Sequence, residues 1–138
     1  MEAIGVGASV LAFLTLGLSS TKVVYELISS IKDGGMHVKQ IKGEIQGLQL
    51  TLERLSRCRH IAELRDEALA ARIKACDDDM KVYATKLREL AVSGTESRLG
   101  KQWKKVKIAL SDKDLTRMSA VVVGHTTALS LYLNATER

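Results

Sequence analysis

The stretch MHVKQIKGEIQGLQLTLERLSRC, residues 36–58, carries the clearest structural signal in the chain. Its apolar side chains recur at alternating steps of three and four residues, at Val38, Ile41, Ile45, Leu48, Leu52 and Leu55. This heptad spacing places all six side chains on one face of an α-helix. Polar and charged residues occupy the other faces, so the segment predicts a helix that packs against its neighbours along one apolar seam.

Two further seams of the same kind lie downstream. A helix is predicted over about 63–92, after a turn at 59–65, and its seam comprises Leu69, Ile73, Cys76, Met80, Tyr83, Leu87 and Leu90. A last helix is predicted from Ser111 onward, with a seam of Leu115, Met118, Val122, His125, Leu129 and Tyr132. Both follow the 3,4 alternation expected of helices that bury one face.

The remaining segments predict two more helices. A long one over about 3–33 ends before Gly34 and Gly35, which supply left-handed backbone after a last turn. A short one over 99–110 carries Trp103, the only tryptophan. The chain has 138 residues, no proline and only 4% aromatic residues, a composition that argues against β-sandwiches and barrels. We therefore expect one all-α domain over residues 1–138, an antiparallel helical bundle of four main helices plus one short helix, at the N-terminal end of a longer protein.

The sequence shows little chemistry of the catalytic kind. No phosphate-binding loop, metal-ligand pattern or activated nucleophile is recognisable, so we expect no enzymatic activity, no cofactor, no metal and no small-molecule substrate. The carboxylates of Asp77, Asp78 and Asp79 are interpreted as a solvated face, and His125, on a seam, as a partly buried, hydrogen-bonded structural histidine. Cys58 and Cys76 predict free thiols in the cytosol. The net charge of +5 permits contact with anionic lipid, and no motif indicates nucleic acid.

The N-terminal segment is the sharpest candidate for function. Nineteen residues from Ala3 to Thr21 carry no charge, which approaches the length needed to span a bilayer. Glycine, serine and threonine dilute its apolar character, so a helix buried at the centre of the bundle explains the pattern as well. The two interpretations are compatible if the helix is sheltered at rest and exposed on activation.

Two smaller features complete the set. The lysines around Trp103 suit an anionic membrane interface, although lysines in water beside a buried tryptophan are the simpler interpretation. Gly43 and Gly47 lie off the apolar seam, four residues apart. Close helix approach inside the bundle accounts for them most simply, and a self-association face is the alternative.

The opening EAIGVGASVLAFL, residues 2–14, is similar to the start of fungal HeLo-like N-terminal domains. Val23–Tyr25, the helix at Ile41–Leu55, the stretch WKKVKIAL at 103–110 and the Leu-Ser-Leu at 129–131 fit the same family pattern. The resemblance implies a helical bundle that heads a receptor of the nucleotide-binding NLR or STAND type. It further implies a cytoplasmic protein that moves to the plasma membrane on activation, where oligomers insert the N-terminal helix and kill the cell.

Taken together, these observations predict a membrane-targeting effector domain. The residues expected to insert into the membrane are Ile4, Val10, Leu11, Phe13, Leu14 and Leu18. Those expected to attract anionic lipid are Lys101, Lys104, Lys105 and Lys107. The alternative is a non-lytic, homotypic interaction bundle, or one that binds a related bundle, for which Gly43 and Gly47 would matter most. An enzyme subunit or a regulator from a biosynthetic cluster is a third possibility.

Overall fold

Four long helices make up most of the part of the chain that the structure, a computed structural model, describes: residues 9–31, 35–95 and 112–136. They are α1 (Val10–Ser29), α2 (Gly35–Ser56), α3 (Glu67–Thr95) and α5 (Asp112–Thr136). A short 3₁₀ turn, η2 (Ile61–Glu63), precedes α3, and these ranges contain no strand. The predicted all-α bundle is confirmed, while the short helix expected over 99–110 falls outside the described residues.

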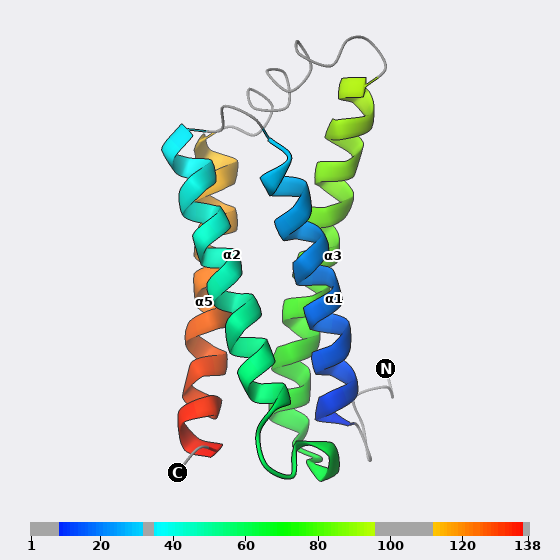
Figure 1. Ribbon diagram of the computed structural model, residues 1–138, viewed down its shortest axis with the longest axis vertical. Helices are drawn as coiled ribbons and strands as arrows, with labels where there is room; N and C mark the ends of the chain where they lie inside the picture. Colours follow the sequence, from blue (N-terminus) through cyan, green and yellow to red (C-terminus); the bar gives the residue numbers. More distant parts are fainter. Residues whose placement is uncertain (1–8, 32–34, 96–111, 137–138) are drawn as a thin grey trace.

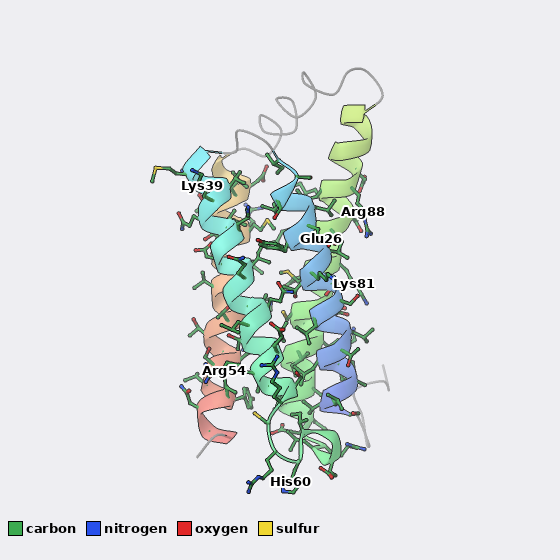
Figure 2. All side chains as sticks on the ribbon, in the orientation of Figure 1. Glu26, Lys39, Arg54, His60, Lys81 and Arg88 are labelled. Carbon is green, nitrogen blue, oxygen red and sulfur yellow. The ribbon has the colours of Figure 1, made fainter. Side chains whose placement is uncertain are left out.

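The helices surround one apolar core, with successive helices running in opposite directions (Figure 1). Around the bundle, α1 lies between α2 and α3, and α2 also packs against α5. The neighbours α1 and α3 run parallel, as do α2 and α5, and the contact between α3 and α5 is the smallest of the four. Charged side chains such as those of Lys39, Arg54 and Arg88 lie on the outside (Figure 2).

The predicted seams form the core. All six apolar residues of the α2 seam are buried. The α3 and α5 seams are buried at every described position except Tyr83 and Tyr132, which are partly buried; the side chain of Leu90 is outside the described set. Burial of this kind stabilises a fold by about 25 cal/mol for each Å² of apolar surface.

The first helix begins later than expected. Ser9 has an extended backbone, and its Oγ accepts a hydrogen bond from the Ala12 N–H at 3.3 Å, so the helix begins at Val10 and not at Ala3. It also ends earlier, at Ser29, where the Ser30 N–H bonds to the Glu26 carbonyl at 3.1 Å. The expected continuation to Asp33 is therefore wrong.

The turn predicted between the second and third helices is confirmed. It extends further along the chain than expected, so α3 begins later than predicted. His60 adopts left-handed backbone with φ of 63°, and the 3₁₀ turn follows it. Asp66 then caps α3, because its Oδ1 accepts a hydrogen bond from the Leu69 N–H at 3.0 Å. The helix thus begins at Glu67, four residues after the predicted start.

Candidate functional site

Helix α1 is long and apolar enough to cross a membrane by length and composition alone. Its best window has a mean hydropathy of 1.4, and 33% of that window is buried inside the bundle. Lys22 carries its first charge, so the half of α1 that begins at Val10 is uncharged. The core helix of a soluble protein passes the same test, and the packing of α1 must therefore be considered residue by residue.

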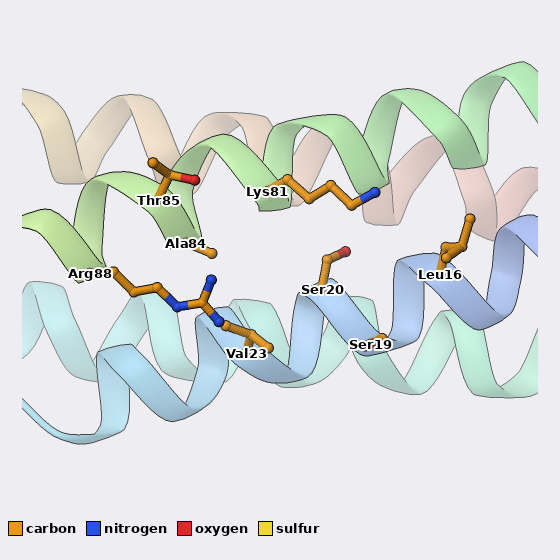
Figure 3. Close-up of a pocket in the computed structure, with 8 residues that line it drawn as sticks. All are labelled: Leu16, Ser19, Ser20, Val23, Lys81, Ala84, Thr85 and Arg88. Atoms are coloured by element: carbon orange, nitrogen blue, oxygen red, sulfur yellow. The ribbon is translucent and has the colours of Figure 1, made fainter.

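A buried polar cluster ties α1 to α3. The Ser20 hydroxyl on α1 lies 2.6 Å from Asp77 Oδ1 on α3, and Lys81 Nζ lies 2.9 Å from the other carboxylate oxygen (Figure 3 shows Ser20 and Lys81). Asp77 is only 3% exposed, so the interpretation of its carboxylate as part of a solvated face is wrong. Asp78 is exposed and Asp79 is partly exposed. A buried carboxylate needs such partners because desolvation penalises an unpaired charge.

The sequence carries a local signal for part of this cluster. Asp77 and Lys81 are spaced i, i+4 on one helix, which is the spacing of a helical ion pair. Asp77 also follows Cys76, a seam residue, and therefore lies beside the buried face. The position of Ser20 opposite this pair depends on the packing of two helices and has no local signature.

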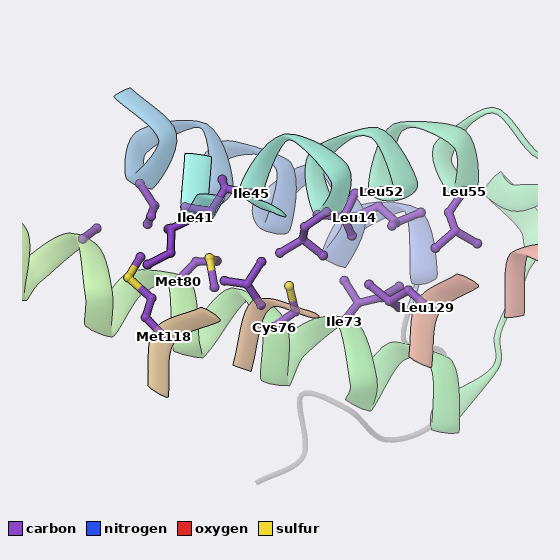
Figure 4. Packing of buried hydrophobic residues seen from close by; sticks show 14 of the residues in the cluster. Leu14, Ile41, Ile45, Leu52, Leu55, Ile73, Cys76, Met80, Met118 and Leu129 are labelled. Carbon is purple, nitrogen blue, oxygen red and sulfur yellow. The ribbon is translucent and has the colours of Figure 1, made fainter. Parts of the chain in front are cut away.

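The predicted insertion residues divide between the core and the surface. Val10 and Leu14 are fully buried, and Leu14 packs in the core shown in Figure 4. Leu11, Phe13 and Leu18 are partly buried against that core. Leu16, which was not among the predicted residues, is 48% exposed. Ile4 and the four lysines Lys101, Lys104, Lys105 and Lys107 lie outside the described residues.

Gly43 and Gly47 do not mediate close helix approach in the bundle. A Cβ atom added at either position would meet no heavy atom within 4 Å, so that interpretation is wrong. Both lie toward the outer side of α2. Met36 and Leu50 lie seven residues before and after Gly43, on the same helix face, and are 83% and 54% exposed. This outer face of α2, defined by Met36, Gly43, Gly47 and Leu50, remains compatible with self-association.

A second polar contact joins α3 to α5 through a buried histidine. His125 is 6% exposed, and its Nε2 lies 2.6 Å from Asp79 Oδ2, which confirms the expected structural histidine. Neither cysteine forms a disulfide, as predicted. Burial first, and then the negative charges of Asp79 and Asp77, raise the pKa of the Cys76 thiol to about 12. This thiol is therefore inert and structural.

The comparisons with known proteins place this bundle in a family. Neither the curated proteins nor the solved structures include a match to the chain. The family described as "Pigment biosynthesis cluster protein PigL N-terminal" matches residues 1–136. Because this match spans nearly the whole chain, the protein belongs to the family of PigL-type N-terminal domains.

Proposed function

We propose that this bundle is a HeLo-like signalling domain that acts at a membrane through α1. Family membership and the all-α fold fit a fungal domain of this class. The finer parts of the proposal are that activated oligomers insert α1 into the plasma membrane and cause regulated cell death. The family description refers to a pigment biosynthesis cluster, so a larger protein that carries the domain need not be a receptor of the NLR or STAND type.

The observation that carries the proposal is that α1 has apolar side chains both in the core and toward solvent. Val10 and Leu14 lie in the core, yet the same uncharged half of the helix presents Leu16 to solvent and leaves Leu11, Phe13 and Leu18 only partly covered. A helix apolar on several faces has more apolar surface than this bundle buries. A bilayer would cover all of it.

Insertion requires α1 to leave the bundle. Its release breaks the Ser20–Asp77 bond and the hydrogen bond from Gln46 Nε2 to the Tyr25 hydroxyl, 3.0 Å long, which joins α1 to α2. It also uncovers the fully buried apolar side chains of α1, each of which contributes about 1.5–3 kcal/mol: Val10, Leu14, Val24 and Ile28. The bilayer restores this burial, and oligomerisation would offset the exposure of the remaining helices.

A matched pair of exposed leucines tests the proposal. Leu16→Lys places a charge on α1, and Leu131→Lys places the same charge on α5, where the side chain is 67% exposed. Both variants should fold, because both side chains face solvent, and both add the same attraction to anionic lipid. A lysine at the centre of an inserted helix costs about 2.5–3.5 kcal/mol, so only Leu16→Lys should lose function.

The measurement is flotation with phosphatidylserine-containing and phosphatidylcholine vesicles, with dye leakage followed in parallel. We expect the parent protein and Leu131→Lys to bind anionic vesicles and make them leak. Leakage caused by Leu16→Lys should be at least about tenfold slower. Equal leakage by the two variants, or no binding to either lipid by the parent, contradicts insertion of α1.

The outer face of α2 supports a second candidate, a non-lytic module that assembles with copies of itself or with a related bundle. The open space at Gly43 and Gly47 would let another helix approach closely between Met36 and Leu50. Sedimentation velocity without lipid would show concentration-dependent oligomers in the parent. Gly47→Leu should abolish them and Gly124→Leu, a similarly open site on α5, should not.

A further inference from the structure

A groove of about 370 Å³ runs between α1 and α3, beside the Ser20–Asp77 bond (Figure 3). Its volume falls within the range of small-molecule sites. The two helices supply it with one apolar wall and several hydrogen-bond donors. Six of the side chains that line it supply the apolar wall or the donors: Leu16, Ser19, Val23, Lys81, Thr85 and Arg88.

The charges of the groove favour an anion. Lys81 and Arg88 both line it, and no carboxylate lines it among the residues that the structure describes. The nearby carboxylate of Asp77 is already engaged through both oxygens, by Ser20 and by Lys81. The Lys81 ammonium has three N–H donors and gives one to Asp77, so donors remain for a ligand. The hydrogen bond to Asp77, followed by its charge, raises the pKa of Lys81 and keeps it protonated.

Arg88 adds the stronger recognition element. Its guanidinium lies on the α1 side of the groove beside Val23 (Figure 3). No ion pair of Arg88 is found within the described ranges 9–31, 35–95 and 112–136. A guanidinium presents a planar fork of donors that matches phosphate and carboxylate oxygens. The hydroxyls of Ser19 and Thr85 line the same groove and can donate as well.

We propose that this groove binds a small organic anion, a phosphate or carboxylate group carried on a short apolar chain. Arg88 donates hydrogen bonds to the oxyanion, Lys81 adds positive charge farther along the same groove, and the apolar chain lies along Leu16 and Val23. This inference goes beyond the membrane role of α1 and holds whether or not α1 enters a bilayer.

A ligand in this position would contact α1 and α3 together. It would therefore bind the closed bundle better than any form in which the two helices have separated, and would stabilise the closed form by mass action. Ligand concentration would then set how readily α1 leaves the bundle.

Hexyl phosphate is the probe, with inorganic phosphate for comparison, titrated into ¹⁵N-labelled protein and followed by NMR. We expect saturable shifts confined to the groove segments, residues 16–23 and 81–88, and a Kd for hexyl phosphate at least about tenfold below that for inorganic phosphate, because the chain buries methylene groups. Arg88→Gln should weaken hexyl phosphate binding about tenfold, since it removes charge-assisted hydrogen bonds.

Arg72→Gln is the matched control, because Arg72 is also an exposed arginine on α3 but does not line the groove. It should change the Kd less than twofold, by the loss of long-range attraction only. Thr85→Val, which removes one hydroxyl at nearly constant shape, should weaken binding to a smaller extent than Arg88→Gln.

Three results would overturn the inference. The first is the absence of saturable shifts at millimolar hexyl phosphate. The second is an equal loss of affinity in Arg88→Gln and Arg72→Gln, which would show general attraction between charges. The third is binding to phosphatidic acid in vesicles without binding to soluble hexyl phosphate, which would assign these cations to a membrane surface.

Discussion

The Oγ of Ser20 and the Oδ1 of Asp77 lie 2.6 Å apart and form a buried hydrogen bond between α1 and α3. The two residues are separated by 57 positions in the chain, so the bond exists only because the two helices pack side by side. Ser20 also approaches the Gly17 carbonyl at 3.2 Å. A hydroxyl has one hydrogen to donate, and the shorter, charge-assisted contact to Asp77 is the stronger of the two.

Removing the Ser20 hydroxyl should weaken the bundle. Ser20→Ala leaves a buried oxygen of Asp77 without this partner, at a cost of about 1–3 kcal/mol in the free energy of unfolding. Ser19→Ala is the control, because Ser19 is the adjacent exposed serine of the same helix and should change stability by less than about 0.5 kcal/mol. Urea denaturation measures both, and equal effects would show that the Ser20–Asp77 bond contributes nothing.

The two thiols should differ in reactivity within one molecule. Cys58 is partly exposed near the turn after α2, whereas Cys76 is buried with its pKa raised to about 12. At pH 8 the thiolate fraction of Cys76 is on the order of 10⁻⁴, and the side chain is covered as well. A chromogenic disulfide reagent should therefore label one thiol per folded chain and two in urea. Rapid labelling of Cys76 in the folded protein would contradict the packing of α3.

The same raised pKa predicts a loss of stability at high pH. Below about pH 9 the Cys76 thiol is neutral in the folded and unfolded chains, and its full contribution to the free energy of unfolding is present. Between pH 9 and about 12 the unfolded chain releases the proton and the folded chain keeps it, so the free energy of unfolding falls as pH rises. Lys81 and Tyr83, whose pKa values are also raised, act in the same direction.

Cys76→Ala isolates the contribution of the thiol, since Lys81 and Tyr83 remain. This variant should be less stable at pH 8, because it leaves a small cavity, and its stability should decline less steeply from pH 8 to 10.5. The slope comes from urea denaturation in the presence of a reductant that does not react with the denaturant. Parallel pH profiles for the parent and the variant would exclude Cys76 as a source of the decline.

Alanine at the open glycines should stabilise the isolated domain. Gly43→Ala and Gly47→Ala each add a methyl group where no atom lies within 4 Å, and glycine inside a helix is about 0.5–1 kcal/mol less favourable than alanine. Gly124→Ala on α5 should give a similar gain. Thermal unfolding at low protein concentration measures these gains. A loss of stability confined to the α2 variants would indicate that copies of the domain pack closely through this face.

The helices and their buried faces could be predicted from the sequence because they depend on local periodicity. The 3,4 spacing of Ile41, Ile45 and Leu48 and that of Leu69, Ile73 and Cys76 mark a single face of a helix whatever it packs against. Ends were harder to predict: Ser9 and Asp66 each cap a helix with one hydrogen bond, and similar residues occur at other positions without capping. The candidate site was predicted in part, since α1 was identified but its division between core and surface was not.

What the sequence determined by itself is therefore the fold class, the approximate positions of the four long helices and the apolar side that each turns inward. The tertiary structure alone decided which helices became neighbours. This packing buries Asp77 against Ser20 and leaves Gly43 and Gly47 facing open space. It also places Arg88 and Lys81 along one groove with Leu16. The physical reason is that periodicity is a property of a few consecutive turns. The partner of a side chain depends instead on how helices distant in the chain pack to bury their apolar faces together.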